Sequence, residues 1–136
     1  MIPFEEEPDY RIGIGTDIHR LVENRKLVLC GIYIPFPLGL LGHSDGDVGL
    51  HAVIDALLGA SGLGDIGTLF PDTDAKWKGA DSKELLLTVK EKLEEKRWQI
   101  VNVDLIIHAE MPKLGPVKGQ MKRVIAGLLG IDFAAV

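Results

Sequence analysis

The stretch "VGLHAVIDALLGA" (48–60) constrains the fold most, because it is apolar on nearly every side of a helix. We predict a helix there from about Ser44 to Ala60. A membrane span needs roughly 20 apolar residues, and this shorter stretch is typical of a helix buried in a globular core. His51 stands in its middle. A histidine in such a place is either a hydrogen-bonded core residue or a ligand.

Apolar and amphipathic segments predict the remaining elements. We expect a strand over 11–15, two short strands or a hairpin over 26–34 broken at Gly31, a helix within 81–98, a strand over 99–109 and a last helix within 115–130. Asp81 and Glu84 have capping-box spacing, and Gly130 is a typical helix end. The predicted inward positions are Leu85, Val89 and Leu93, then Val101, Val103, Leu105 and Ile107, then Val117, Met121, Val124 and Leu128. This order is typical of either an α/β or an α+β domain, with helices covering one face of the sheet. Of the two we expect α+β, with helices packed on one face of a small mixed sheet.

Composition excludes several classes of function. The 136 residues fit a single domain over 1–136, and the net charge of −5 gives no electrostatic case for nucleic-acid binding. Cys30, the one cysteine, cannot form an internal disulfide, which is typical of a reducing compartment. The acidic opening "MIPFEEEPDY" resembles no signal peptide. We therefore expect a small-molecule site, no nucleic-acid or membrane partner, and a cytoplasmic location, or a plastid in a plant or alga.

Three residues have the pattern of a metal site. Asp17 and His19 are two positions apart, so an extended segment places both on one face, roughly 7 Å apart. With His51 they make a three-ligand set with an open position, typical of catalytic zinc and equally suited to non-haem iron. Asp47 and Asp55, one turn to either side of His51, are placed to orient its ring. The alternatives are a surface Asp-x-His turn and a hydrogen-bonded core histidine.

Two positions suit a phosphate ligand. At the entrance to the 48–60 helix, His43 can donate to an anion, and the helix terminus adds partial positive charge. Ser44 or Asp45 is expected to cap that helix. Lys113 offers a single mobile charge after the last predicted strand. The alternatives are a capping turn with a surface histidine and an ordinary solvated lysine.

The loop over 62–80 contains two partial motifs, one for dinucleotide binding and one for calcium binding, and neither meets the full requirement of its motif. Gly62, Gly64 and Gly67 have dinucleotide-motif spacing, but a helix precedes them where that motif needs a strand. "DTDAKWKGAD" begins like a calcium loop, yet Lys76 takes a ligand position and Trp77 takes that of the glycine. What remains is a polar loop, which beside a metal site would serve as a substrate lid.

Six stretches of the chain are informative because of their order along it: "RIGIGTDIHRL", "GLLGHSDGDVGLHAVIDALLGA", "GLGDIGTLFPDTD", "KGADSKELL", "NVD" and "AEMPKL". Together they resemble the 2-C-methyl-D-erythritol 2,4-cyclodiphosphate synthases of the non-mevalonate isoprenoid pathway. The resemblance runs from Arg11 to about Gly130. Its most specific parts are the His-Ser-Asp-Gly-Asp segment and the Phe-Pro-Asp-Thr-Asp loop.

The resemblance implies a set of site residues. Asp17, His19 and His51 would bind one zinc ion per chain, with Asp17 and His19 also reaching substrate. His43 would be catalytic, facing the substrate phosphates with Ser44. The pocket residues implied are Asp65, Ile66, Gly67, Phe70, Pro71, Asp72, Thr73 and Asp74. Those implied for the cytidine diphosphate end, donated across a subunit boundary, are Ala109, Met111, Pro112, Lys113 and Leu114.

The implied enzyme is a phosphorus–oxygen lyase. It converts 4-diphosphocytidyl-2-C-methyl-D-erythritol 2-phosphate into the cyclodiphosphate and releases CMP, as the substrate's own 2-phosphate attacks its β-phosphorus. A second ion, Mg²⁺ or Mn²⁺, would bridge the diphosphate, and a homotrimer assembled through its sheets would place active sites at the interfaces. Family members continue into a strand with a Thr-Thr-Glu motif. The chain is therefore expected to be C-terminally incomplete relative to the family, with zinc binding retained and full activity dependent on that motif.

Two other classes of function use the same ligands. One is a metal-binding structural or regulatory domain without catalysis, and the other is a zinc-dependent hydrolase with a bound water. Release of CMP would favour the synthase, inorganic phosphate without cyclisation the hydrolase, and tight zinc without turnover the binding domain.

Overall fold

The computed structural model describes residues 9–136, so most of the acidic opening lies outside it. The strands are β1 (Leu21–Val22), β2 (Leu27–Leu29), β3 (Ile32–Ile34) and β4 (Gly39–Leu40), and the helices are α1 (Val48–Ser61), α2 (Ile66–Leu69), α3 (Ser82–Glu95) and α4 (Lys118–Leu129). Three 3₁₀ turns cover Ala75–Trp77, Gly115–Val117 and Phe133–Ala135. Over the described residues, no helix has both the length and the apolar character needed to cross a membrane.

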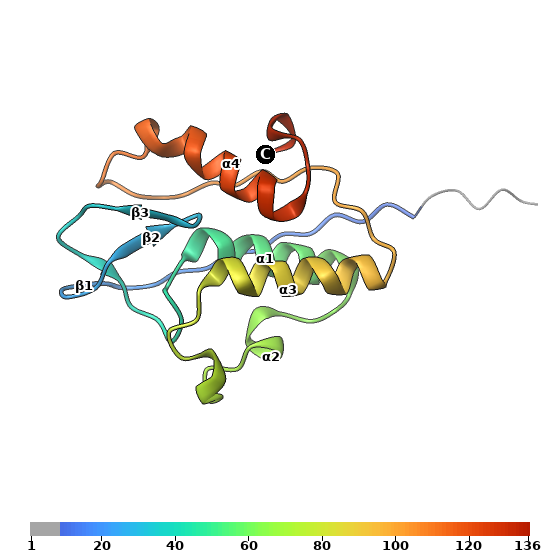
Figure 1. Ribbon diagram of the computed structural model, residues 1–136, viewed down its shortest axis with the longest axis horizontal. Helices are drawn as coiled ribbons and strands as arrows, with labels where there is room; N and C mark the ends of the chain where they lie inside the picture. Colours follow the sequence, from blue (N-terminus) through green and yellow to red (C-terminus); the bar gives the residue numbers. More distant parts are fainter. Residues whose placement is uncertain (1–8) are drawn as a thin grey trace, which may run out of the picture.

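Helix α1 forms the centre of the molecule and lies alongside α3 (Figure 1). Leu50, Ile54 and Leu58 are completely buried along it, which confirms the prediction of a core helix. The predicted start at about Ser44 was wrong. The helix begins at Val48, because the carboxylate of Asp47 accepts the free N–H of Leu50 and acts as the cap.

Helix α3 buries the face that its spacing predicts, whereas the predicted inward stripe of α4 was wrong, because only Met121 of it is buried. The inward stripe of α3, Leu85, Val89 and Leu93, is confirmed, and Asp81 caps the helix by accepting from the N–H of Lys83. In α4 the buried positions are Met121, Ile125, Ala126 and Leu129, whereas Val124 and Leu128 are half-buried. The predicted stripe started at Val117, which lies in a 3₁₀ turn with a different period. Gly130 ends α4 with φ 66°, as predicted.

The strands form two small antiparallel pairs within residues 9–136, β1 with β4 and β2 with β3. The hairpin of β2 and β3 is confirmed, and Cys30 and Gly31 at its turn both have positive φ, the conformation that two-residue hairpin turns require. The predicted mixed sheet was wrong for this part of the chain, because neither 11–15 nor 99–109 pairs with another strand.

The two unpaired segments still run extended along the helices (Figure 1). Val103, Leu105 and Ile107 pack against the core at alternate positions, as the predicted alternation requires, but Val101 is 71% exposed. A segment with one packed face shows apolar residues at every second position, as a strand does. It is not a strand here, because a strand is defined by its hydrogen-bonded ladder.

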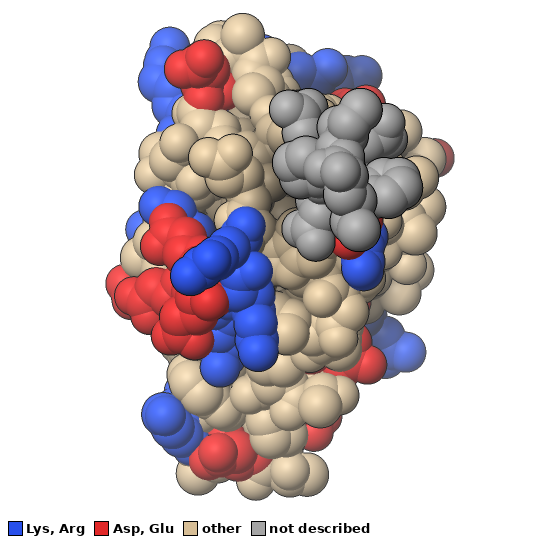
Figure 2. All heavy atoms as spheres, turned by 90° about the vertical axis from the view of Figure 1, so that its right-hand side faces the viewer, with Lys and Arg blue, Asp and Glu red and all other residues tan. Residues whose placement is uncertain are grey.

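Charges of both signs are mixed on the surface. On the face in Figure 2, acidic and basic side chains lie next to one another, and much of the remaining area is uncharged. Lys90 and Glu94, one turn apart on α3, form an ion pair with 3.4 Å between Nζ and Oε1. No single sign of charge dominates that face, in keeping with the composition.

Candidate metal centre

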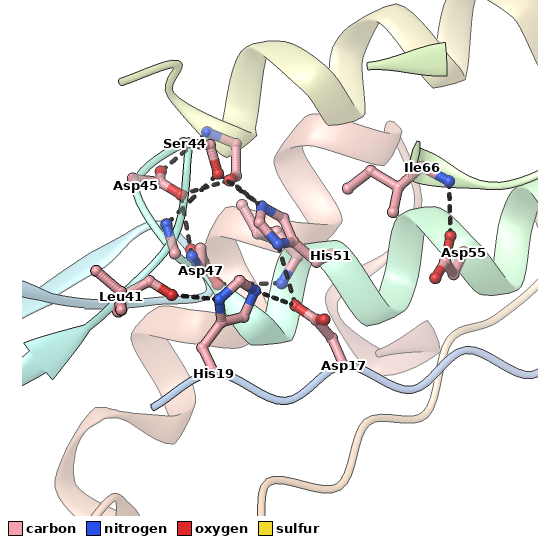
Figure 3. A network of polar contacts seen from close by, with 12 residues as sticks. Asp17, His19, Leu41, Ser44, Asp45, Asp47, His51, Asp55 and Ile66 are labelled. Atoms are coloured by element: carbon pink, nitrogen blue, oxygen red, sulfur yellow. Dashed lines mark hydrogen bonds and ion pairs between the residues drawn. The ribbon is translucent and has the colours of Figure 1, made fainter. Parts of the chain in front are cut away.

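The three predicted metal ligands lie together. Their ligand atoms are all within 4.8 Å of one another. Asp17 Oδ2 lies 2.9 Å from His19 Nε2 and 3.1 Å from His51 Nδ1, and Figure 3 shows both imidazole rings turned towards this carboxylate. Asp17 and His19 come from the extended segment before β1, and His51 comes from the first turn of α1. The interpretation of Asp17 and His19 as an isolated surface turn is therefore wrong.

Two glycines bring the extended segment close enough to α1. A Cβ atom at Gly13 would lie 2.0 Å from the carbonyl oxygen of Ala56, and one at Gly15 would lie 2.0 Å from that of Ala52. Real Cβ atoms never approach backbone oxygens so closely. The glycines therefore permit the contact that places Asp17 beside His51.

His19 is held so that its Nε2 faces Asp17. Its Nδ1 lies 2.5 Å from the carbonyl oxygen of Leu41. A carbonyl only accepts hydrogen bonds, so Nδ1 carries a proton, and Nε2 is the nitrogen left to face Asp17. At 2.9 Å from the carboxylate oxygen, Nε2 needs either a second proton or a metal cation between the two atoms, because two lone pairs would repel each other. The donor set of two imidazoles and a carboxylate therefore fits a divalent metal ion.

Asp17 is in the form that a metal ligand needs. Burial raises the pKa of Asp17, but the hydrogen bond with His51 and the charges of His19 and His51 outweigh it and hold the pKa below its ordinary value. The side chain is 24% exposed, which leaves one side of the cluster open to a ligand.

The ring of His51 is oriented by groups that the sequence did not indicate. Its Nε2 lies 2.7 Å from Ser82 Oγ and 3.1 Å from Ser44 Oγ, and Ser82 donates its hydroxyl hydrogen to Asp45. The predicted orienting groups, Asp47 and Asp55, were wrong. They accept from backbone N–H groups elsewhere: Asp47 from Cys30, Gly31 and Leu50, and Asp55 from Ile66.

These missed partners left little trace in the sequence. Leu41 contributes a backbone carbonyl, which is independent of residue type. Ser82 directly follows the capping aspartate Asp81, and a serine at this position is common at the start of an ordinary helix. Ser44 and Asp45, predicted as caps of α1, instead contact His51 and Ser82.

The residues predicted to face phosphate lie around the same turn. His43 Nε2 is 3.2 Å from the carbonyl oxygen of Asp74, and the N–H of Gly79 donates to the carbonyl of His43. The structure thus brings the Phe-Pro-Asp-Thr-Asp loop against the His-Ser-Asp-Gly-Asp turn. Ser44 lies beside His51 in the same turn.

The predicted pocket loop is built from two capped turns. Asp65 caps α2 and accepts from the N–H of Thr68 at 2.7 Å, and hydrogen bonds from Thr68 hold its pKa below the ordinary value. Asp74 caps the 3₁₀ turn that follows by accepting from Lys76. The ring of Phe70 is buried edge-on against Trp77, so this residue anchors the loop to the core.

The predicted cytidine segment lines a separate cavity of about 550 Å³. Ala109, Pro112, Lys113 and Leu114 line it together with residues of α4, and none of the three metal ligands does. Met111, also predicted there, is 58% exposed and is not part of the lining. Within one chain, the cavity and the metal ligands are therefore distinct features.

Comparisons with known proteins agree with this arrangement. The model of the YgbB family matches residues 10–136. The 2-C-methyl-D-erythritol 2,4-cyclodiphosphate synthase of Neisseria gonorrhoeae is 56% identical over 126 residues, which cover 93% of this chain and 79% of the relative. That of Treponema denticola is 52% identical over 122 residues, covering 90% and 76%.

Solved structures give the same result. A structure of 2C-methyl-D-erythritol-2,4-cyclodiphosphate synthase superposes with a TM-score of 0.87 at 46% identity and covers 92% of this chain and 83% of its own. A CDP-bound form superposes with a TM-score of 0.86 at 44% identity, with the same coverage. The chain therefore belongs to the YgbB family of 2-C-methyl-D-erythritol 2,4-cyclodiphosphate synthases and is an enzyme of isoprenoid biosynthesis.

Proposed function

We propose that this enzyme converts 4-diphosphocytidyl-2-C-methyl-D-erythritol 2-phosphate into 2-C-methyl-D-erythritol 2,4-cyclodiphosphate with release of CMP, and that Asp17, His19 and His51 hold zinc for this reaction. The observation that carries the proposal is the convergence of these three donors within 4.8 Å, beside the turn that holds His43 and Ser44. Family membership supplies the substrate class.

Zinc suits this donor set, although non-haem iron shares it. When bound, zinc supplies a Lewis acid and a template for phosphate oxygens. A second ion, Mg²⁺ or Mn²⁺ on the substrate diphosphate, stays a prediction drawn from the family resemblance, as does the cytoplasmic location.

The chain itself has to position the substrate rather than attack it. The 2-phosphate of the substrate is the nucleophile, so the protein holds the two phosphates in line and neutralises the charge that develops. We assign His43 to donate to a phosphoryl oxygen, with Ser44 beside it. The loop residues Asp65, Ile66, Gly67, Phe70, Pro71, Asp72, Thr73 and Asp74 are proposed to enclose the substrate.

The cavity beside α4 is proposed to receive the cytidine diphosphate end. Lys113 in its lining supplies positive charge, and a structural relative has been solved with CDP. We propose that this cavity serves the metal site of a neighbouring subunit in a homotrimer, since the two features are distinct within one chain. Met111, which does not line the cavity, is still predicted to contact the cytidine diphosphate end.

One experiment separates the synthase from its alternatives. The protein is purified, its zinc content is measured by elemental analysis, and product formation is followed by chromatography of CMP and phosphate. We expect one zinc per chain and CMP release, with zinc lost in His51→Ala and kept in the exposed control His108→Ala. Full zinc in His51→Ala would contradict the ligand set. Phosphate without CMP would support a hydrolase, and zinc without turnover a binding domain.

His43 is tested in the same assay. His43→Ala is expected to keep its zinc and to lose about 10²–10³ in rate, roughly 2.7–4 kcal/mol, as removal of a transition-state donor does. Ser44→Ala should cost less, because Ser82 also contacts the same nitrogen of His51. Loss of zinc in His43→Ala would make His43 a ligand, and full turnover would remove it from the reaction.

A further inference from the structure

Two side chains, the half-buried Asp45 and the buried Ser82, lie behind the ring of His51, on the side away from Asp17. Ser82 is completely buried as the first residue of α3. Its hydroxyl oxygen is 2.7 Å from His51 Nε2, and Nδ1 of the same ring is 3.1 Å from Asp17. The chain of contacts therefore runs from Asp45 through Ser82 and His51 to the metal cluster.

The carboxylate of Asp45 fixes which way these hydrogen bonds point. Asp45 accepts twice from Ser82, from the hydroxyl at 2.5 Å and from the backbone N–H at 2.9 Å. An ionised carboxylate only accepts, so the single hydroxyl hydrogen of Ser82 is used on Asp45. The oxygen of Ser82 then accepts from His51, which places a proton on Nε2. The proton that Nδ1 shares with Asp17 is the one that a bound cation would displace.

The pair is itself held rigidly between two helices. Asp45 Oδ1 also accepts from the N–H of Asp47, the cap of α1, at 3.0 Å. The N–H of Asp45 donates to the carbonyl of Ala80, just before α3. Because Asp45 is fixed by these backbone contacts, the hydroxyl hydrogen of Ser82 stays directed at Asp45 and does not point towards His51.

We propose that Ser82, oriented by Asp45, is a positioning residue that keeps the proton on Nε2 of His51, so that Nδ1, which faces Asp17, is the nitrogen left to bind a divalent cation. This inference rests on the proposed function, since it assigns the support of the same metal site. It makes His51 the counterpart of His19, whose ring is fixed by the carbonyl of Leu41.

Ser44 is the competing candidate for this role. Its oxygen is 3.1 Å from His51 Nε2, against 2.7 Å for Ser82. It accepts a long bond of 3.4 Å from the N–H of Gly46, and among the described residues its hydroxyl contacts no carboxylate. Ser82 therefore has both the shorter contact and the fixed donor direction.

The test is the zinc affinity of the full chain, measured by competition with a chromophoric chelator. Removing a group that orients a metal-bound histidine typically weakens binding about 10–100-fold, and we expect Ser82→Ala to fall in this range. Ser82→Thr, which keeps the hydroxyl, should restore most of the affinity, and Ser44→Ala should lose less than Ser82→Ala. The matched control is Ser61→Ala, because Ser61 bonds only to carbonyls of its own helix.

A second measurement does not depend on the variants folding. Nitrogen-15 NMR of histidine-labelled, zinc-loaded wild type should show a proton on Nε2 of His51 and the metal at Nδ1. Zinc at Nε2, or unchanged affinity in Ser82→Ala, would overturn the inference while leaving the proposed function standing. Absence of zinc binding by the wild type would overturn the metal assignment of the proposed function, and this inference with it.

Discussion

The surroundings of Cys30 change the pKa of its thiol. It lies completely buried at the turn of the β2–β3 hairpin, next to the buried carboxylate of Asp47. Burial, followed by the charge of Asp47, raises the pKa of the Cys30 thiol from 9.0 to about 12. At pH 8 this lowers the thiolate fraction roughly 1,000-fold. We expect thiol reagents to modify Cys30 only as fast as the protein unfolds, which can be measured by comparing labelling and unfolding rates.

The raised pKa of Cys30 also predicts a pH dependence. Above pH 9 the unfolded chain loses the thiol proton while the folded chain keeps it up to about pH 12. The folded state then binds more protons, so its stability falls as pH rises through this window, by at most about 1.4 kcal/mol per pH unit. Urea unfolding of wild type and Cys30→Ser at pH 8.5 and 10.5 tests this. Equal slopes in both proteins would show that Cys30 titrates normally.

The metal cluster depends on the close contact between the extended segment before β1 and helix α1. Gly15→Ala would place a Cβ 2.0 Å from the backbone oxygen of Ala52, so the segment has to move and carry Asp17 and His19 away from His51. We expect a loss of about 1–3 kcal/mol in unfolding free energy, as in other overpacked sites, together with weaker zinc binding. Gly59→Ala, on α1 itself but facing open space, is the control and should be neutral or stabilising. Wild-type zinc affinity in Gly15→Ala would contradict this account of the site.

The elements themselves differ in how far the sequence predicts them. The hairpin and α3 follow from local signals, namely the Cys30–Gly31 turn and the spacing of Leu85 and Val89. The start of α1 does not, because Ser44, Asp45 and Asp47 are all good caps and only tertiary contacts choose among them. The contact between His51 and Ser82 joins residues 31 positions apart. No local pattern encodes such a distance, whereas the ligand types of Asp17, His19 and His51 are evident from chemistry alone.

The two extended segments lie against the helices on one side and leave large apolar side chains exposed on the other (Figure 1). Ile12, Ile14 and Ile18 are between 87% and 97% exposed on the first segment, and Val101 and Ile106 are 71% and 75% exposed on the second. Exposed apolar side chains of this size favour an interaction site where they gather into a patch. The family resemblance implies that a further copy of the chain is the partner.

We predict the homotrimer that the family resemblance implies, with a mass in solution three times the 14.8 kDa of the chain. Light scattering at micromolar concentration measures it directly. Ile14→Lys and Ile106→Lys should each shift the mass towards that of the monomer, because a charge buried in an apolar contact is costly unless it is paired. Tyr33→Lys, at a 57% exposed position on β3, is the control and should leave the mass unchanged. A monomeric wild type would contradict the trimer and would leave the cavity beside α4 without a neighbouring metal site to serve.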